Sequence, residues 1–171
     1  MEITPAVYLS LGSNLGNRKQ FLENAIELLA QKGFSIVSVS SVYQTPAIGI
    51  EGAPDFLNCC VKANTHLNPN ELIRTIHEIE LHLGRIRREN ETTSRTIDID
   101  LIFYGNTILH QPDLQVPHPR YHERKFVLLP LIDLDDGLID PAQGIPVNYF
   151  LKNCPDKSTV EKYPLSLFTK E

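Results

Sequence analysis

The chain has few of the features that mark secreted, membrane-spanning or general nucleic-acid-binding proteins. Its three cysteines form no C-x-x-C pair, which fits reduced thiols and gives no zinc site. No apolar run approaches the roughly 18 residues needed to span a bilayer, and Met1 to Ala6 carry no signal-peptide pattern. A net charge of -5 argues against a general nucleic-acid binder. We therefore expect a cytoplasmic protein with neither a membrane nor a nucleic-acid partner.

Length and composition favour one folded unit. With 171 residues, 42% of them hydrophobic, the chain can bury a full core, and we expect residues 1–171 to form a single domain. Alternating or continuous apolar runs predict strands, whereas apolar stripes at helical spacing between capping residues predict helices. In chain order these are a strand over 7–11, a helix over 18–32, strands over 35–43 and 56–64, a helix from Asn68 to Gly84, and a strand over 95–104.

This order, β-α-β-β-α-β, is that of a ferredoxin-like α+β fold. The second and third strands should pair antiparallel, and both helices should cover one face of the antiparallel sheet. The opposite face is then left for a ligand. We expect C-terminal additions to this core: a short edge strand over 114–116, a helical turn over 123–130 and a short helix over 147–152.

Two acidic residues stand out in the last strand of the core. Asp98 and Asp100 alternate with Ile97, Ile99 and Leu101, so both carboxylates lie on one face, roughly 7 Å apart. After Asp100 the sequence is apolar on both faces, which places the pair at the edge of a core. Such a pair resists desolvation unless a cation neutralises it. The alternatives are a site for one or two Mg²⁺ ions or the solvated face of an antiparallel strand.

Cationic side chains flank this pair in the sequence. Such groups suit a substrate whose phosphates bridge metal and guanidinium groups. The prolines of Pro117-His118-Pro119-Arg120 could present His118 and Arg120 rigidly, or could simply end a strand. The flanking cations are Arg85, Arg87, Arg88 and Arg95 before the pair, and His118, Arg120 and Arg124 after it.

Several other polar positions allow two interpretations. The loop over 12–17 could cradle phosphate, but matches no phosphate-binding signature, and such clusters are usually turns. The loop over 45–54 is long for a connection, which favours a functional role. Asn58 could recognise a ligand or be an exposed strand residue. His77 and Glu80 could form a solvated ion pair or belong to a site near Asp98.

Six segments together resemble the 6-hydroxymethyl-7,8-dihydropterin pyrophosphokinases of folate synthesis. The match runs from about Val7 to Leu134, and Arg-Thr-Ile-Asp-Ile-Asp followed by Pro-His-Pro-Arg is its most specific part. Relatives often have an arginine and an aromatic residue where this chain has Glu91 and Thr92. The matching segments are 8–18, 43–46, 54–58, 80–85, 94–101 and 117–120.

The resemblance implies a ferredoxin-like fold and a Mg²⁺-dependent enzyme. It would transfer the diphosphate of ATP to the hydroxymethyl group of the dihydropterin and release AMP. A rival hypothesis is a ferredoxin-like module that binds RNA or a regulatory ligand. RNA-binding modules of this shape expose aromatic residues on central strands and tend to be basic, whereas this strand carries two aspartates. We expect a monomer that acts on two small molecules.

The resemblance also implies a role for each matching residue. Asp98 and Asp100 would hold two Mg²⁺ ions, and Arg85 and Arg95 would bind phosphate and support transfer. The ATP-binding residues would be His77, Glu80, Arg85, Arg87, Arg95, Leu101, His118 and Arg124. The pterin would contact Thr45, Pro46, Ile48 and Asn58, with Phe56 and Phe126 stacked on its two faces. A side-chain amide can both donate to and accept from a pterin edge.

Overall fold

The computed structural model describes residues 4–49, 51–85, 94–164 and 167 of the chain. Among the residues considered above, Arg87, Arg88, Glu91 and Thr92 lie outside this part. Described helices and strands follow the predicted order. They are β1 (Ala6–Ser13), α1 (Arg18–Gln31), β2 (Phe34–Val39), β3 (Val42–Thr45), β4 (Phe56–Thr65), α2 (Pro69–His82), β5 (Asp98–Tyr104), β6 (Leu109–Gln111), β7 (Leu114–Val116), the 3-10 turn η1 (Tyr121–Glu123), α3 (Lys125–Leu134), α4 (Val147–Lys152) and β8 (Glu161–Tyr163).

The main sheet has the predicted antiparallel, ferredoxin-like arrangement. Its strands lie in the order β5-β1-β4-β3-β8, and β2 pairs with β4 beside β3. The single strand predicted over 35–43 is in fact two strands. Ser40 interrupts it, because its N–H donates to the Cys60 carbonyl at 2.9 Å while its Oγ accepts from the Cys60 N–H at 2.8 Å. This break lets β3 run on beside the end of β4 that faces the candidate site.

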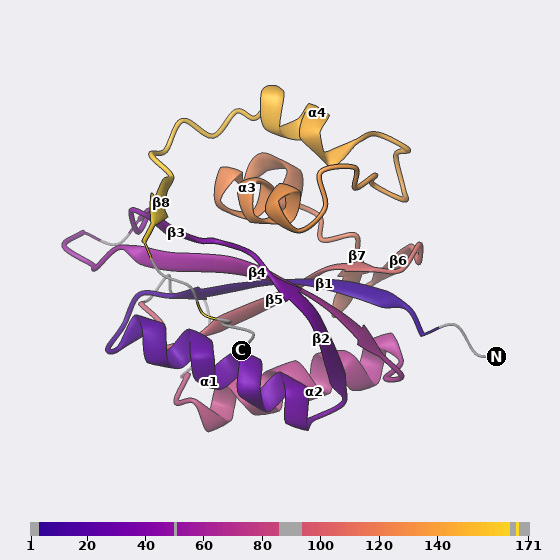
Figure 1. Cartoon of the computed structure of the whole chain (residues 1–171), viewed down its shortest axis with the longest axis horizontal. Coiled ribbons are helices and arrows are strands. Elements are labelled where there is room, and N and C mark those ends of the chain that lie inside the picture. The colour runs from indigo at the N-terminus through magenta and orange to yellow at the C-terminus, as the bar shows by residue number, and fades with distance from the viewer. Residues whose placement is uncertain (1–3, 50, 86–93, 165–166, 168–171) are drawn as a thin grey trace.

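Helices α1 and α2 cover one face of the sheet, as predicted (Figure 1). The side chain of Asn17 accepts from the Gln20 N–H at the start of α1. Asn68 and Glu71 form a capping box at the start of α2, an arrangement that satisfies two backbone donors. Buried apolar residues of both helices join those of the strands in one core, which includes Leu22, Leu29, Leu72, Ile76, Leu9, Leu11 and Ile99.

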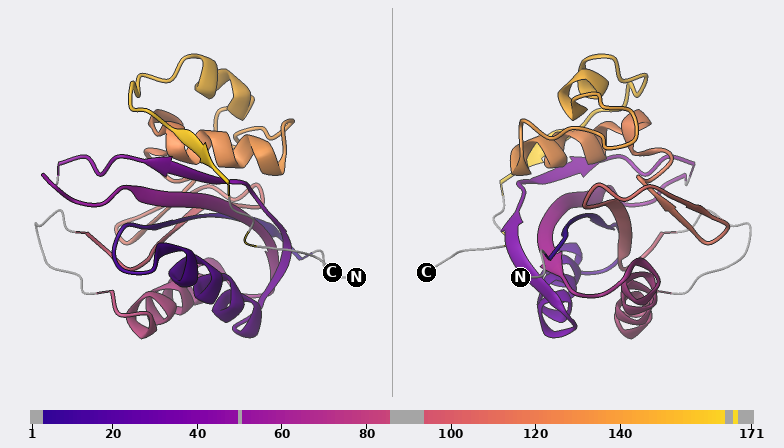
Figure 2. Two further views of the ribbon diagram at one scale, coloured as in Figure 1. Left: turned by 60° about the vertical axis from the view of Figure 1, so that its left-hand side comes forward. Right: turned by 90° about the vertical axis from the view of Figure 1, so that its right-hand side faces the viewer.

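The opposite face of the sheet is not left entirely to a ligand. The C-terminal additions α3 and α4 pack over part of it (Figures 1 and 2). A second apolar cluster there contains Ile102 and Phe103 of β5 with Tyr121 and Leu128. Register shifts between Tyr8 and Leu9 as β1 pairs with β5, so β5 bulges and turns apolar residues to both faces. The face of β5 that carries Asp98 and Asp100 thus enters the second apolar cluster at Ile102.

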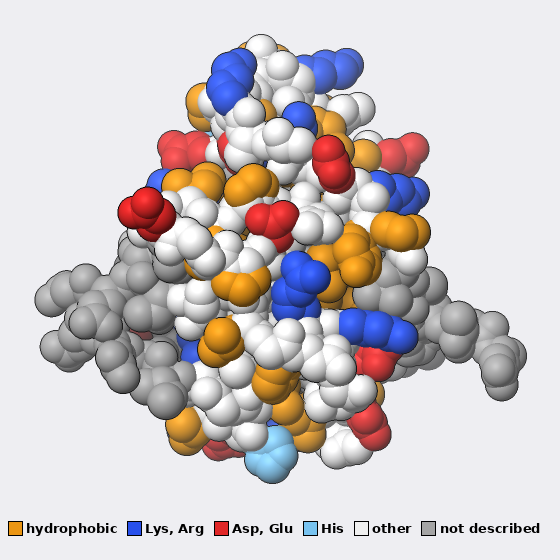
Figure 3. Space-filling model, turned by 90° about the vertical axis from the view of Figure 1, so that its left-hand side faces the viewer, with side chains coloured by type: hydrophobic (Ala, Val, Ile, Leu, Met, Phe, Trp, Pro, Cys, Tyr) orange, Lys and Arg blue, Asp and Glu red, His pale blue; other side chains and the backbone are white. Residues whose placement is uncertain are grey.

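Among the described residues, no helix is both long and apolar enough to cross a membrane. The face of the molecule shown in Figure 3 intersperses apolar, basic and acidic side chains with uncharged ones. Among the described side chains of that face, basic and acidic groups are thus mixed.

Candidate functional site

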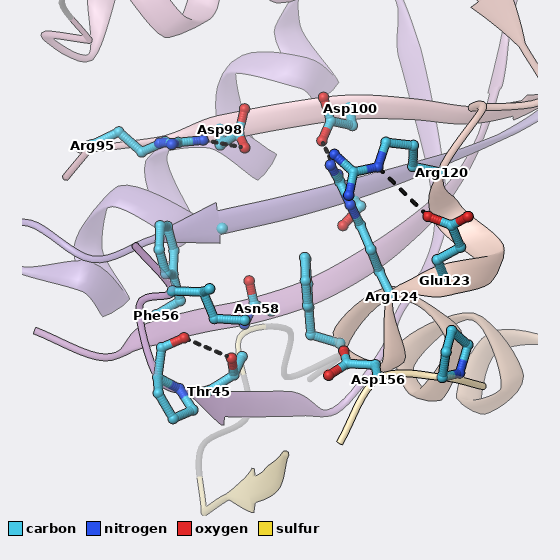
Figure 4. Close-up of a pocket in the computed structure, with 16 residues that line it drawn as sticks. Thr45, Phe56, Asn58, Arg95, Asp98, Asp100, Arg120, Glu123, Arg124 and Asp156 are labelled. Carbon is cyan, nitrogen blue, oxygen red and sulfur yellow. Dashed lines mark hydrogen bonds and ion pairs between the residues drawn. The ribbon is translucent and has the colours of Figure 1, made fainter. Parts of the chain in front are cut away.

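A cavity of about 610 Å³ opens on the sheet face that α3 leaves uncovered. Strands β1, β3, β4 and β5 form its floor, and the segment from Arg120 to Phe126 forms one wall (Figure 4). The cavity brings together ten of the predicted site residues: Thr45, Pro46, Ile48, Phe56, Asn58, Arg95, Asp98, Asp100, Arg124 and Phe126.

Strand register sets the positions of the polar groups on this floor. Gly12 of β1 lies opposite Asp98 of β5 on one side and opposite Asn58 of β4 on the other. Directly paired residues share a face of the sheet, and neighbouring strands are about 4.8 Å apart. An acidic side chain and an amide therefore stand in one row, with a residue that has no side chain between them. Ser10 lies opposite Asp100 in the adjacent row.

Guanidinium groups surround the acidic pair. Arg85 Nη1 donates to Asp98 Oδ1 at 2.7 Å, and Arg95 Nη1 donates to Asp98 Oδ2 at 3.1 Å. Arg124 Nη1 lies 4.0 Å from Asp100 Oδ2. Burial and the neighbouring Asp98 charge raise the pKa of Asp100 to about 7, although Arg124 opposes the shift. An acid with so high a pKa is short of positive charge, which a bound cation would supply.

Glu80 differs from the solvated ion pair that α2 periodicity suggested. Its side chain is buried, and Oε2 accepts from the Ile99 N–H at 3.0 Å. The same oxygen contacts Arg85 Nη1. Burial lowers the pKa of Arg85, but Asp98 and Glu80 outweigh burial and leave that pKa raised. Glu80 therefore fixes both the strand that carries the aspartates and an arginine that contacts Asp98.

The other side of the cavity suits a flat, polar-edged ring. Asn58 is only 3% exposed, and its Nδ2 has no hydrogen-bond partner among the described residues. A buried donor without a partner is costly, so a ligand that accepts from it would gain affinity. Phe56 and Phe126 line the same space, and each lies within 6 Å of a guanidinium: Arg95 over Phe56 at 5.7 Å, and Arg124 over Phe126 at 5.9 Å.

Five of the described residues predicted to bind ATP do not line the cavity: Glu80 and Arg85, whose contacts are given above, and Leu101, His77 and His118. Leu101 is buried in the core on the helix side of the sheet, and His77 is exposed on α2. His118 is partly buried, and its Nδ1 accepts a hydrogen bond from the Arg120 N–H at 3.1 Å. Burial and the charge of Arg124 lower the pKa of His118 to about 4, so its imidazole is neutral near pH 7. Their proposed contacts with nucleotide remain predictions.

Six cavity residues were given no role by the family resemblance. They are Ser10, Gly12, Arg120, Glu123, Pro155 and Asp156. Asn14, which lay in a loop predicted to be a turn, is fully buried; its Oδ1 accepts from the Arg95 N–H at 2.8 Å, and its Nδ2 donates to Pro54 and Ser94. Pairing of β1 with β4 and β5 could have indicated Ser10 and Gly12, and Arg120 lay in the Pro-His-Pro-Arg segment. No local pattern marks Glu123, Pro155 or Asp156.

The acidic pair has suitable chemistry for a hard divalent cation. Carboxylate oxygens are the ligands that Mg²⁺ prefers, and Mg²⁺ usually keeps only one or two of them and takes the rest from water and phosphate. Among the described residues, no group of three or more His, Cys, Asp and Glu side chains is arranged to hold a metal ion. The carboxylates of Asp98 and Asp100 suit a Mg²⁺ ion that takes its other ligands from water and phosphate.

Comparisons with known proteins agree with this geometry. The chain is 41% identical over 128 residues to the 2-amino-4-hydroxy-6-hydroxymethyldihydropteridine pyrophosphokinase of Bacillus subtilis, covering 74% of this chain and 76% of that protein. It is 38% identical over 144 residues to the protein of the same name from Aquifex aeolicus, covering 84% and 89%. The folic acid synthesis protein fol1 of Pneumocystis carinii is 40% identical over 148 residues, covering 86% of this chain.

Some relatives are much longer than this chain. It spans only 20% of the Pneumocystis protein and 24% of the Dictyostelium discoideum protein FOL1. The fold also matches the crystal structure of wild-type Plasmodium falciparum HPPK-DHPS, with a TM-score of 0.71 and 16% identity, covering 90% of this chain and 45% of that one. The sequence model of the 7,8-dihydro-6-hydroxymethylpterin-pyrophosphokinase (HPPK) family matches residues 8–136, and the chain belongs to that family.

Proposed function

We propose that this protein transfers the diphosphate of ATP to the hydroxymethyl oxygen of 6-hydroxymethyl-7,8-dihydropterin and releases AMP, as a step of folate synthesis. Family membership supports the reaction. The observation that carries the proposal is the row formed by Asp98, Gly12 and Asn58. It sets a carboxylate that can hold a divalent cation and an amide with no described hydrogen-bond partner for its Nδ2 on one cavity floor. The carboxylate would hold the metal that binds the phosphate donor, and the amide would bind the ring of the alcohol that receives the diphosphate. Transfer requires the two substrates to lie side by side.

In this proposal the pterin occupies the Asn58 side of the cavity. Asn58 Nδ2 donates to an acceptor on the ring edge, and Phe56 and Phe126 pack against the ring faces. Each aromatic contact contributes about 0.5–1.5 kcal/mol beyond area burial. Thr45 and Pro46, at the end of β3, and the exposed Ile48 would form the outer wall. The hydroxymethyl group then points along the row toward Asp98.

ATP phosphates would occupy the Asp98 side. Asp98 and Asp100 would hold two Mg²⁺ ions together with the phosphates, and Arg85, Arg95 and Arg124 would pair with phosphate oxygens. Bound Mg²⁺ would neutralise phosphate charge and lower the pKa of the attacking hydroxyl. Phosphoryl transfer depends on alignment and charge stabilisation more than on covalent help from the protein. We assign no general base. His118 would contact the triphosphate as a neutral imidazole.

The proposal also covers the domain organisation, the oligomeric state and the cellular location. We infer a single domain over residues 1–171, a monomer, and a cytoplasmic location. Cys59 and Cys60 support the location, because they are free, adjacent and fully buried, as expected of thiols that stay reduced. Burial raises the pKa of Cys59 to about 12, which suppresses its reactive thiolate.

The test is AMP release from ATP, Mg²⁺ and hydroxymethyl-dihydropterin. Asp98→Ala and Asp100→Ala should each lower turnover at least ~10²-fold while circular dichroism stays native-like, since each removes charge from the transfer site. Asp113→Ala is the matched control, because Asp113 is exposed in the turn between β6 and β7. Near-normal turnover in both site variants would remove the metal assignment. Tight RNA binding without AMP release would instead support the binding-module hypothesis.

A further inference from the structure

The chain beyond the family match returns to the cavity. After α4, residues Pro155 and Asp156 form part of the wall of the cavity that Arg124 and Phe126 also line. Asp156 and Arg124 are labelled in Figure 4. Residues 8–136 are the part that the family model matches, so this wall comes from the C-terminal addition. Its contribution cannot be read from the family motifs.

Asp156 lines the cavity, but its described hydrogen bonds are with the chain itself. Oδ2 accepts from the Lys125 N–H at 3.1 Å. Oδ1 accepts from the Ser158 N–H at 2.9 Å and from Ser158 Oγ at 2.6 Å. Both carboxylate oxygens are thus engaged by protein donors. This geometry suits a side chain that holds other residues in place rather than one that binds substrate.

The Lys125 N–H opens helix α3. The preceding residue, Arg124, makes no side-chain capping hydrogen bond, so the first turn takes its side-chain acceptor from Asp156, 31 residues later. Helix N-termini are stabilised by such acceptors and by negative charge. Burial raises the pKa of Asp156, but the hydrogen bonds from Ser158 and Lys125 outweigh burial and leave that pKa lowered, so the group is ionised near pH 7.

The residues on either side of Lys125 are both cavity residues. Arg124 lies 4.0 Å from Asp100, and its guanidinium lies 5.9 Å from the Phe126 ring. We propose that Asp156 is a positioning residue, which fixes the first turn of α3 and thereby holds Arg124 and Phe126 in the orientation that the cavity needs. For its effect on catalysis, the inference rests on the proposed function, in which Arg124 contacts ATP and Phe126 contacts the pterin.

The expected signature is weaker binding of both substrates with little change in the chemical step. Loss of a capping acceptor costs about 1 kcal/mol, which corresponds to about a fivefold shift between an ordered and a frayed first turn. Asp156→Ala should therefore raise KM for ATP and for the dihydropterin by up to about fivefold each, with kcat within about twofold. Asp156→Asn keeps an oxygen acceptor for the Lys125 N–H and should restore both KM values to within about twofold of the wild type.

Amide hydrogen exchange tests the same contact without turnover. In the ligand-free protein, the Lys125 amide should exchange about fivefold faster in Asp156→Ala than in the wild type, and Asp156→Asn should reverse most of this change. Asp135→Ala is the matched control, because Asp135 Oδ1 accepts from the Gly137 N–H just past the other end of α3. It should leave both KM values and Lys125 exchange unchanged.

Each outcome bears on one inference only. If wild-type protein released no AMP, the proposed function would fail, but the exchange measurement would still decide whether Asp156 holds Lys125. Unchanged Lys125 exchange in Asp156→Ala would overturn the positioning role, as would an Asp156→Asn variant no better than Asp156→Ala. Should Asp156→Ala not fold, Ser158→Ala can replace it, because it removes the hydroxyl that donates to Asp156 Oδ1. This variant should raise both KM values about twofold. KM values equal to those of the wild type would also overturn the positioning role.

Discussion

Replacing Glu80 by alanine should destabilise the protein more than any other single acidic-to-alanine change on α2. Strand β5 is at the edge of the main sheet, and Glu80 accepts the Ile99 N–H between the two aspartates at 3.0 Å. Its carboxylate also pairs with Arg85, whose side chain is 12% exposed against 2% for Glu80. The change therefore leaves the buried Ile99 N–H without its Glu80 acceptor and removes one of the carboxylates that pair with the largely buried Arg85.

The size of the loss follows from those two contacts. A buried donor without a partner costs about 1–3 kcal/mol, and removing one partner of a buried ion pair costs about 3–5 kcal/mol. These contributions overlap, and Arg85 keeps its pairing with Asp98, so we expect the free energy of unfolding to fall by about 3 kcal/mol in Glu80→Ala, the lower end of the ion-pair range. Glu80→Gln keeps an oxygen for the Ile99 N–H and should lose about 1–2 kcal/mol.

Urea-induced unfolding followed by circular dichroism measures this loss as a lower midpoint at an unchanged slope. Glu78→Ala is the control on the same helix, because Glu78 is exposed; it should stay within about 0.5 kcal/mol of the wild type. A Glu80→Ala protein as stable as the control would refute the reasoning, since it would mean that neither the Ile99 N–H nor Arg85 depends on this carboxylate.

Two further predictions concern the cavity. In Asn58→Ala, the loss of one or two hydrogen bonds should raise KM for the dihydropterin about 10- to 100-fold, whereas Asn64→Ala, farther along β4, should not; equal KM values would place the ring elsewhere. The raised pKa of Asp100, about 7 against an ordinary 3.8, means that the folded state binds the proton more tightly. Without divalent ions, the stability that Asp100 contributes is then full below pH 4 and lost as pH rises toward 7. In the presence of a chelator, the melting temperature should fall more steeply with rising pH in the wild type than in Asp100→Asn. Parallel curves for the two proteins would contradict this. The prediction is one of direction, because solvent screens a side chain that is 35% exposed.

The core of the fold could be predicted because its signals are local. Capping residues at Asn17 and Asn68 began helices where the structure begins them, and strict alternation placed Asp98 and Asp100 on one face. The break at Ser40 could not be predicted, because alternation continues across it and only a hydrogen-bond pair with Cys60 on another strand ends the run.

What the sequence left open depends on partners distant along the chain. Glu80 has helical spacing that fits the border of a buried stripe, and its burial goes with its hydrogen bond to the Ile99 N–H on edge strand β5. Asp156 lies in a segment without periodicity, and its contact with Lys125 spans 31 positions. Asn14 likewise holds Arg95 across 81 positions. Spacing patterns report neighbours within an element, so they carry no information about such contacts.

The bare backbone at Gly12 limits what evolution can place there. A methyl group at that position would stand 2.9 Å from Asn58 Oδ1, closer than real Cβ contacts come. The backbone angles at Gly12 pose no obstacle to other residues, so the constraint is space alone. A saturation library at position 12, selected for growth without external folate, should therefore return glycine, while the same library selected only for soluble expression should tolerate alanine and serine as well.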